Sequence, residues 1–169
     1  MMLKMLDLFC GLGGASQAMR ERGWLVHTLD IDPKFHPTWC MDINDFHASE
    51  YYDLIWCSPV CTEFSKMSMP WFDHSIPPSM RQVEECYRII EEVRPRWWVI
   101  ENVRGAVPYL GTPTKRVGSR YLWGDFPDFD CKHIYGKWRL PPSEDRASLR
   151  SMIPRELSYA LCLACESYK

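Results

Sequence analysis

A glycine-rich turn near the N-terminus is the first feature of this sequence that could hold a ligand. Gly11, Gly13 and Gly14 follow an apolar run, and a glycine backbone can turn sharply and approach a cofactor closely. Asp30 comes about twenty residues later, the separation at which a carboxylate accepts from ribose hydroxyls in nucleotide-binding folds. Asp42 could accept from an exocyclic amine in the same way. These residues favour a nucleotide-like cofactor and leave a dinucleotide and S-adenosylmethionine equally open.

Two further residues could carry covalent and acid–base chemistry. Cys61 follows a Ser-Pro turn, and a cysteine thiolate is a strong nucleophile. Glu101 ends an apolar run, and a carboxyl group with a raised pKa can act as an acid. Taken alone, a cysteine is usually packing and a glutamate is usually solvated, so the surrounding sequence decides their roles.

Strand–helix alternation indicates how these residues would be positioned. The apolar runs at residues 3–9, 24–29, 53–57 and 97–100 predict strands, and residues 15–22, 79–93 and 154–166 predict helices. This order predicts an α/β fold, a mostly parallel sheet with helices on both faces, whose ligands bind beyond the carboxyl ends of the strands. Residues 105–150 predict short strands and ordered loops. With 169 residues, the chain is expected to form one domain, 1–169.

Three motifs in order resemble those of the cytosine-C5 DNA methyltransferase family. Residues 7–14, DLFCGLGG, resemble its first motif, and residues 58–65, SPVCTEFS, resemble its catalytic loop. Residues 101–103 match its Glu-Asn-Val motif, and residues 150–154 are a weaker analogue of its closing motif. The resemblance covers residues 4–103 and implies a Rossmann-like S-adenosylmethionine-dependent methyltransferase fold.

The resemblance also implies which residues hold the cofactor, S-adenosyl-L-methionine. Asp30 would hold the ribose, Ile31 would pack on the adenine, and Asp42 would bind the adenine edge. In full, the family's pocket positions fall on Phe9, Gly11, Gly13, Asp30, Ile31 and Asp42.

The catalytic positions of the family fall on Cys61 and Glu101. C5 of cytosine is a poor nucleophile, and attack of a thiolate on C6 would convert the ring into an enamine-like species that can accept a methyl group at C5. Protonated Glu101 would donate to N3 as negative charge builds there. The resemblance therefore implies an enzyme that methylates C5 of cytosine through a covalent Cys61 adduct.

Some positions depart from the family pattern. Val60 replaces the usual proline before the nucleophile, and Thr62 replaces the usual glutamine after it. The arginine motif is echoed only by Arg116 and Arg120. About thirty residues separate Arg120 from the closing motif, too few for a separate target-recognition domain. We therefore expect a compact, phage-like or mobile-element enzyme, whose target recognition could come from a protein partner.

The net charge does not decide which molecule accepts the methyl group. A net charge of −2 and a pI near 6.2 are not typical of an autonomous duplex-DNA binder, although residues 94–169 carry an excess of basic side chains. DNA, duplex or single-stranded, is the expected partner, with RNA or a free cytosine nucleotide as an alternative. A catalytically degenerate, S-adenosylmethionine-binding regulatory partner is a further alternative. A nicotinamide-dependent oxidoreductase is disfavoured, because the glycine spacing is not Gly-x-Gly-x-x-Gly.

The remaining signals concern the cellular compartment and metals. The eight cysteines and five histidines form no pattern typical of a zinc site, so no metal is expected. The sequence shows no signal peptide and no apolar stretch long enough to span a bilayer. We expect a cytoplasmic protein of a bacterial or phage-infected host cell. Restriction protection, evasion of host defence and regulation remain equally open as its purpose.

Overall fold

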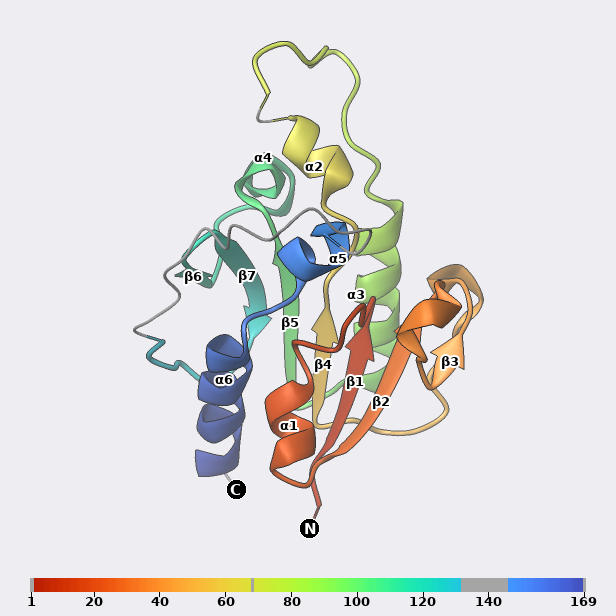
Figure 1. Ribbon diagram of the computed structural model, residues 1–169, viewed down its shortest axis with the longest axis vertical. Coiled ribbons are helices and arrows are strands. Elements are labelled where there is room, and N and C mark those ends of the chain that lie inside the picture. The colour runs from red at the N-terminus through yellow and green to blue at the C-terminus, as the bar shows by residue number, and fades with distance from the viewer. Residues whose placement is uncertain (1, 68, 132–145, 169) are drawn as a thin grey trace.

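The computed structural model describes residues 2–67, 69–131 and 146–168. Within them one sheet has the strand order β3-β2-β1-β4-β5-β7-β6 (Figure 1). The first five strands pair in parallel, whereas β7 runs antiparallel to both β5 and β6. The strands are β1 (Lys4–Leu8), β2 (Leu25–Asp30), β3 (Trp39–Cys40), β4 (Leu54–Cys57), β5 (Trp97–Asn102), β6 (Lys115–Val117) and β7 (Arg120–Asp125).

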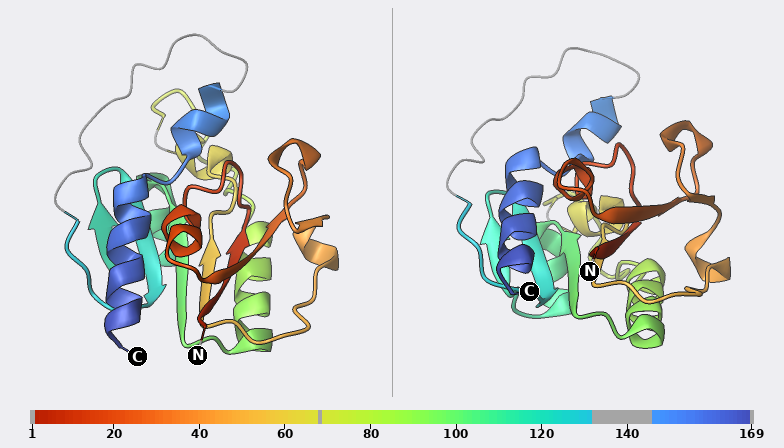
Figure 2. Two further views of the ribbon diagram at one scale, coloured as in Figure 1. Left: turned by 60° about the horizontal axis from the view of Figure 1, so that its bottom comes forward. Right: turned by 90° about the horizontal axis from the view of Figure 1, so that it is seen from below.

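Helices cover both faces of this sheet. Helices α1 (Gln17–Glu21) and α6 (Arg155–Ser167) lie on one face, and α3 (Arg81–Val93) lies on the other (Figure 2). Three shorter helices lie beyond the carboxyl ends of the central strands: α2 (Thr62–Lys66), α4 (Val107–Leu110) and α5 (Arg146–Ser151). Single 3-10 turns are η1 (Pro33–Phe35), η2 (Ile43–Asp45) and η3 (Arg104–Ala106). The predicted α/β architecture is confirmed.

The central strands are apolar on both faces because both faces are covered. In β4, Leu54 and Trp56 point into the core beneath α1 and α6, while Ile55 and Cys57 point into the core beneath α3. All four side chains are fully buried. This two-sided burial explains why the strand is an unbroken apolar run rather than an alternating one.

The predicted elements agree with the observed ones to within a few residues. The first helix is shorter than predicted, and Pro154 is the N-cap of α6, next to its first turn. The predicted short strands of residues 105–150 are present as β6 and β7, but α4 and the start of α5 are helices that the sequence did not predict there. Residues 132–145 lie outside the described residues. None of the helices in the described part of the chain combines the length and apolar character that a membrane crossing needs.

Candidate active site

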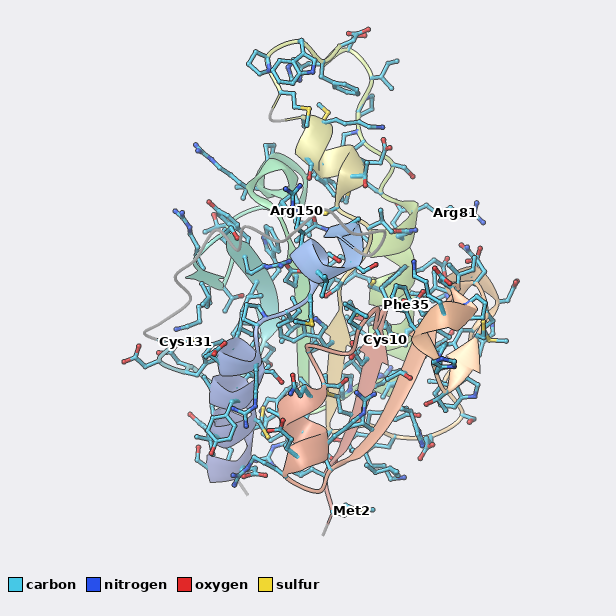
Figure 3. The ribbon with its side chains drawn as sticks, viewed as in Figure 1. Met2, Cys10, Phe35, Arg81, Cys131 and Arg150 are labelled. Carbon is cyan, nitrogen blue, oxygen red and sulfur yellow. The ribbon has the colours of Figure 1, made fainter. Side chains whose placement is uncertain are left out.

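The carboxyl ends of β1, β2, β4 and β5 surround a cavity of about 510 Å³. Figure 3 labels Cys10 on the loop after β1 and Arg150 on α5 beyond it. Of the residues predicted from the sequence to form the site, seven line this cavity: Phe9, Gly11, Asp30, Ile31, Asp42, Cys61 and Glu101. The structure therefore brings the predicted cofactor residues and the predicted catalytic residues into one space.

Gly13 is the predicted residue that does not line the cavity. It has a left-handed φ of 75°, and its N–H donates to the Cys10 carbonyl at 2.8 Å, so its part is to close the turn. Gly14 lines the cavity instead. A Cβ atom on Gly14 would lie 2.3 Å from the Ile153 carbonyl oxygen, so only glycine allows the segment before α6 to pack against this loop.

The Asp30 carboxylate links the glycine loop to the end of β2. Its Oδ2 accepts from Gly11 N–H at 2.9 Å, and its Oδ1 accepts from Asp32 N–H at 3.0 Å. A carboxylate has about four acceptor positions, so two remain for other donors. Ile31, which follows it, exposes 68% of its surface at the cavity. An acceptor beside an exposed apolar side chain fits a ribose carrying a flat heterocyclic base.

Asp42 lines the cavity from the loop after β3. Its Oδ1 accepts from the Asn44 backbone N–H at 2.9 Å and from the Asn44 side chain. These hydrogen bonds lower the pKa of Asp42, so the group is a carboxylate at neutral pH. Its other oxygen remains available to a donor such as an exocyclic amine.

Asp7, which is buried, and Cys10, which is partly exposed, also line the cavity. Ser16 Oγ donates to Asp7 Oδ2 at 2.6 Å, and burial raises the pKa of Asp7 to about 7. Burial, together with the charges of Asp7 and Asp30, raises the pKa of Cys10 to about 12. The carboxylates of Asp30 and Asp42 in the lining fit a cofactor that carries positive charge, as S-adenosylmethionine does at its sulfonium and ammonium groups.

Cys61 is the thiol of the cavity that remains available for chemistry. It is partly exposed and immediately precedes α2, where its carbonyl accepts from Ser65 N–H at 2.8 Å. Phe64, only 1% exposed, anchors that helix on the protein. Cys10 lines the same cavity, but its raised pKa keeps it protonated at neutral pH.

Glu101 is a buried carboxyl group at the end of β5. Burial raises its pKa, although the charge and hydrogen bond of Arg120 and a hydrogen bond from Ser58 act in the opposite direction. Arg120 Nη1 lies 3.1 Å from Glu101 Oε1, and Trp56 Nε1 donates to Ser58 Oγ at 2.7 Å. The carboxyl group is therefore held in one orientation and favoured in its protonated form relative to an exposed glutamate.

Arg120 is the residue that the sequence left undecided. It lines the cavity, and its Nη2 donates to the carbonyl oxygens of Arg150 at 2.9 Å and Met152 at 3.1 Å. It thereby joins Glu101 to the end of α5 and to the residue that follows it. The other candidate, Arg116, donates to the Gly118 carbonyl at 2.9 Å and stacks on Tyr121. The sequence signal was the weak arginine motif, which could not choose between the two.

Comparison with protein-family models identifies the family to which this site belongs. The C-5 cytosine-specific DNA methylase model matches residues 3–109. The chain belongs to this family. Its members are S-adenosylmethionine-dependent methyltransferases, and the mostly parallel sheet has their Rossmann-like fold. The matched range contains every predicted site residue and ends before Arg120.

Individual relatives are considerably longer than this chain. The type II methyltransferase M.XorII of Xanthomonas oryzae pv. oryzae is 29% identical over 121 residues, which cover 59% of this chain and 28% of that protein. A proposed DNA modification methyltransferase encoded within an E. coli prophage is 24% identical, with a TM-score of 0.47, over 62% of this chain and 33% of that one. The S. pombe Dnmt2 methyltransferase is 22% identical, with a TM-score of 0.42, over 63% and 36%. The chain thus spans about a third or less of each of these proteins.

Proposed function

We propose that this protein is a DNA (cytosine-5-)-methyltransferase that uses Cys61 as a covalent nucleophile. The observation that supports this proposal most directly is the shared cavity, which Asp30 and Asp42 line together with Cys61 and Glu101. Family membership supports the reaction class. The raised pKa of Glu101 supports its part as the acid.

The cofactor would be held by the loops after β1, β2 and β3. The two unused acceptor positions of Asp30 would take the ribose hydroxyls, Asp42 would take the adenine amino group, and Ile31 would cover the adenine face. Phe9 and Gly11 would shape the remaining wall. When bound, S-adenosylmethionine supplies an electrophilic methyl group.

Cys61 and Glu101 would divide the work on the cytosine ring. The Cys61 thiolate attacks C6 and forms a C–S bond, which moves the C5–C6 π electrons into the ring toward N3. Glu101, protonated, donates to N3 and stabilises that charge. The resulting enamine carries electron density at C5, which would take the methyl group as the sulfonium sulfur of the cofactor becomes a neutral thioether. Removal of the C5 proton by a base then drives cleavage of the C–S bond and returns the thiolate. Return of the N3 proton to Glu101 restores the aromatic ring and the acid.

A cytosine in duplex DNA must leave its stack before Cys61 can reach C6. This costs a few kcal/mol in a duplex and little in a single strand. The match covers only 28% of M.XorII, so recognition of a target sequence would come from a protein partner or from a segment outside residues 1–169. We therefore expect the catalytic unit to methylate single-stranded DNA more readily than duplex DNA.

The acceptor is tested by transfer of radiolabelled methyl groups from S-adenosylmethionine to duplex DNA, single-stranded DNA, RNA and free cytidine nucleotides. Label is expected in DNA. The single strand should be labelled faster, because extruding a base from it costs less free energy than from a duplex. Nuclease digestion followed by chromatography should place the label in 5-methylcytosine. Label found only in RNA or in free nucleotides would show that DNA is not the substrate. Cofactor binding without transfer to any acceptor would indicate a regulatory partner.

Asp30→Ala is expected to weaken S-adenosylmethionine binding by about 10- to 100-fold, because it removes charge-assisted acceptors for the ribose and the anchor of Gly11. Isothermal titration calorimetry measures the affinity. Asp32→Ala is the matched control, since this neighbouring acid is absent from the cavity lining. Equal affinity of the Asp30 variant and the wild type would remove Asp30 from the cofactor site.

A further inference from the structure

Two side-chain amides hold the backbone just before Cys61. Asn102 Nδ2, at the end of β5, donates to the Pro59 carbonyl at 3.0 Å. Gln82 Oε1, in the first turn of α3, accepts from the Val60 N–H at 2.9 Å. The two residues that precede the nucleophile are therefore each fixed by a different element of the fold.

The second of these bonds exists only because residue 60 is not proline. Proline has no N–H and would leave Gln82 without this donor, but its ring would fix φ by itself. Val60 lacks that ring, so the backbone before Cys61 has one more rotatable bond than a Pro-Cys loop. The hydrogen bond to Gln82 restores the lost constraint through a side chain that arrives from a distant part of the sequence.

The residues on either side of Gln82 are held by contacts with other parts of the protein. The neighbouring Arg81, labelled at the start of α3 in Figure 3, donates through Nε to Asn44 Oδ1 at 2.9 Å. Val83, 1% exposed, packs in the same buried cluster as Phe64 of α2. Gln82 itself is partly buried and lines both the 510 Å³ cavity and an adjoining space of about 290 Å³. The helix turn that presents its amide is thus fixed on both sides.

We propose that Gln82 is a positioning residue that holds the nucleophile loop in place of the constraint a proline would give. It acts through the backbone of Val60, whose N–H donates to its amide oxygen. The proposal rests on the proposed function for its catalytic consequence, because the position of Cys61 matters only if Cys61 attacks the cytosine ring. The hydrogen bond itself can be tested without any activity.

The test is a double-mutant cycle. Gln82→Met keeps the side-chain length but removes the acceptor, and it is expected to lower kcat for methyl transfer about fivefold while leaving cofactor affinity unchanged. Gln82→Glu keeps an acceptor and should stay within about twofold of wild type. In a Val60→Pro background, Gln82→Met should have no further effect, because the N–H is already gone. Gln17→Met, at an exposed position of α1, is the matched control.

Amide hydrogen exchange gives a second readout on the protein without cofactor or DNA. Protection of the Val60 amide is expected to fall in Gln82→Met and to persist in Gln82→Glu and Gln17→Met. Unchanged protection in Gln82→Met, or an equal loss of kcat with and without Val60→Pro, would overturn the proposal. If Gln82→Met loses protection at Val60 but the wild type methylates no acceptor, the loop constraint is supported and the proposed function is wrong.

Discussion

Cys61→Ala is expected to abolish methyl transfer, with a loss of roughly 10³-fold or more, because it removes the thiol that would form the bond to C6. Cys10 is the other thiol at the cavity, and its pKa of about 12 keeps it from substituting as a nucleophile. Cofactor affinity should remain near that of the wild type, since Cys61 precedes α2 and none of the proposed cofactor contacts involves its side chain. Radiolabel transfer and calorimetry on the same preparation measure the two properties separately.

The covalent step can be trapped with an oligonucleotide that contains 5-fluorocytosine. In the presence of S-adenosylmethionine, methyl transfer leaves fluorine at C5, which cannot depart as a proton does. The elimination that breaks the C–S bond is therefore blocked, and the Cys61 adduct should persist through denaturing electrophoresis. Peptide mapping by mass spectrometry should locate the adduct on residue 61. Cys40→Ala is the control, because this exposed thiol is not among the cavity-lining residues and its removal should preserve the adduct. Full turnover by the Cys61 variant would contradict the proposed nucleophile.

The part of the site that follows directly from strand ends was predictable from the sequence. Asp30 is the last residue of β2, and Cys61 lies in the loop that follows β4. The carboxyl ends of parallel strands meet at one edge of a sheet. Once the runs at β1, β2, β4 and β5 are recognised as strands, their terminal residues must lie near one another. Such local signals do not require knowledge of contacts between distant segments.

The residues that the sequence did not assign depend on such distant contacts. Arg120 is brought to Glu101 by the antiparallel pairing of β5 with β7, a strand direction that apolar periodicity does not reveal. Gln82 reads as an ordinary polar residue on the outer side of a helix, and only the path of the loop before Cys61 brings Val60 to it. The role of Gly14 also depends on a distant contact. Its close neighbour is Ile153, far along the chain, and the sequence alone does not show that the two residues meet.

Glu101→Gln is expected to lower kcat by about 10²- to 10⁴-fold, because the amide keeps the volume and accepts from Arg120 but cannot transfer a proton to N3. The buried site should tolerate this isosteric change, so the thermal midpoint and the cofactor affinity serve as controls for folding. Near-normal kcat in a folded Glu101→Gln protein would exclude Glu101 as the acid.

The pH profile gives Glu101 a signature that a structural role would not produce. Burial raises its pKa, so the protonated acid persists to a higher pH than in an exposed glutamate, and transfer should fall as the pH rises through that raised pKa. This descending limb should be absent from Glu101→Gln. Arg120 favours the carboxylate through its charge, so Arg120→Met should raise the pKa of Glu101 further and move the limb to higher pH. A limb that survives in Glu101→Gln, or that Arg120→Met moves to lower pH, would assign the titration to another group.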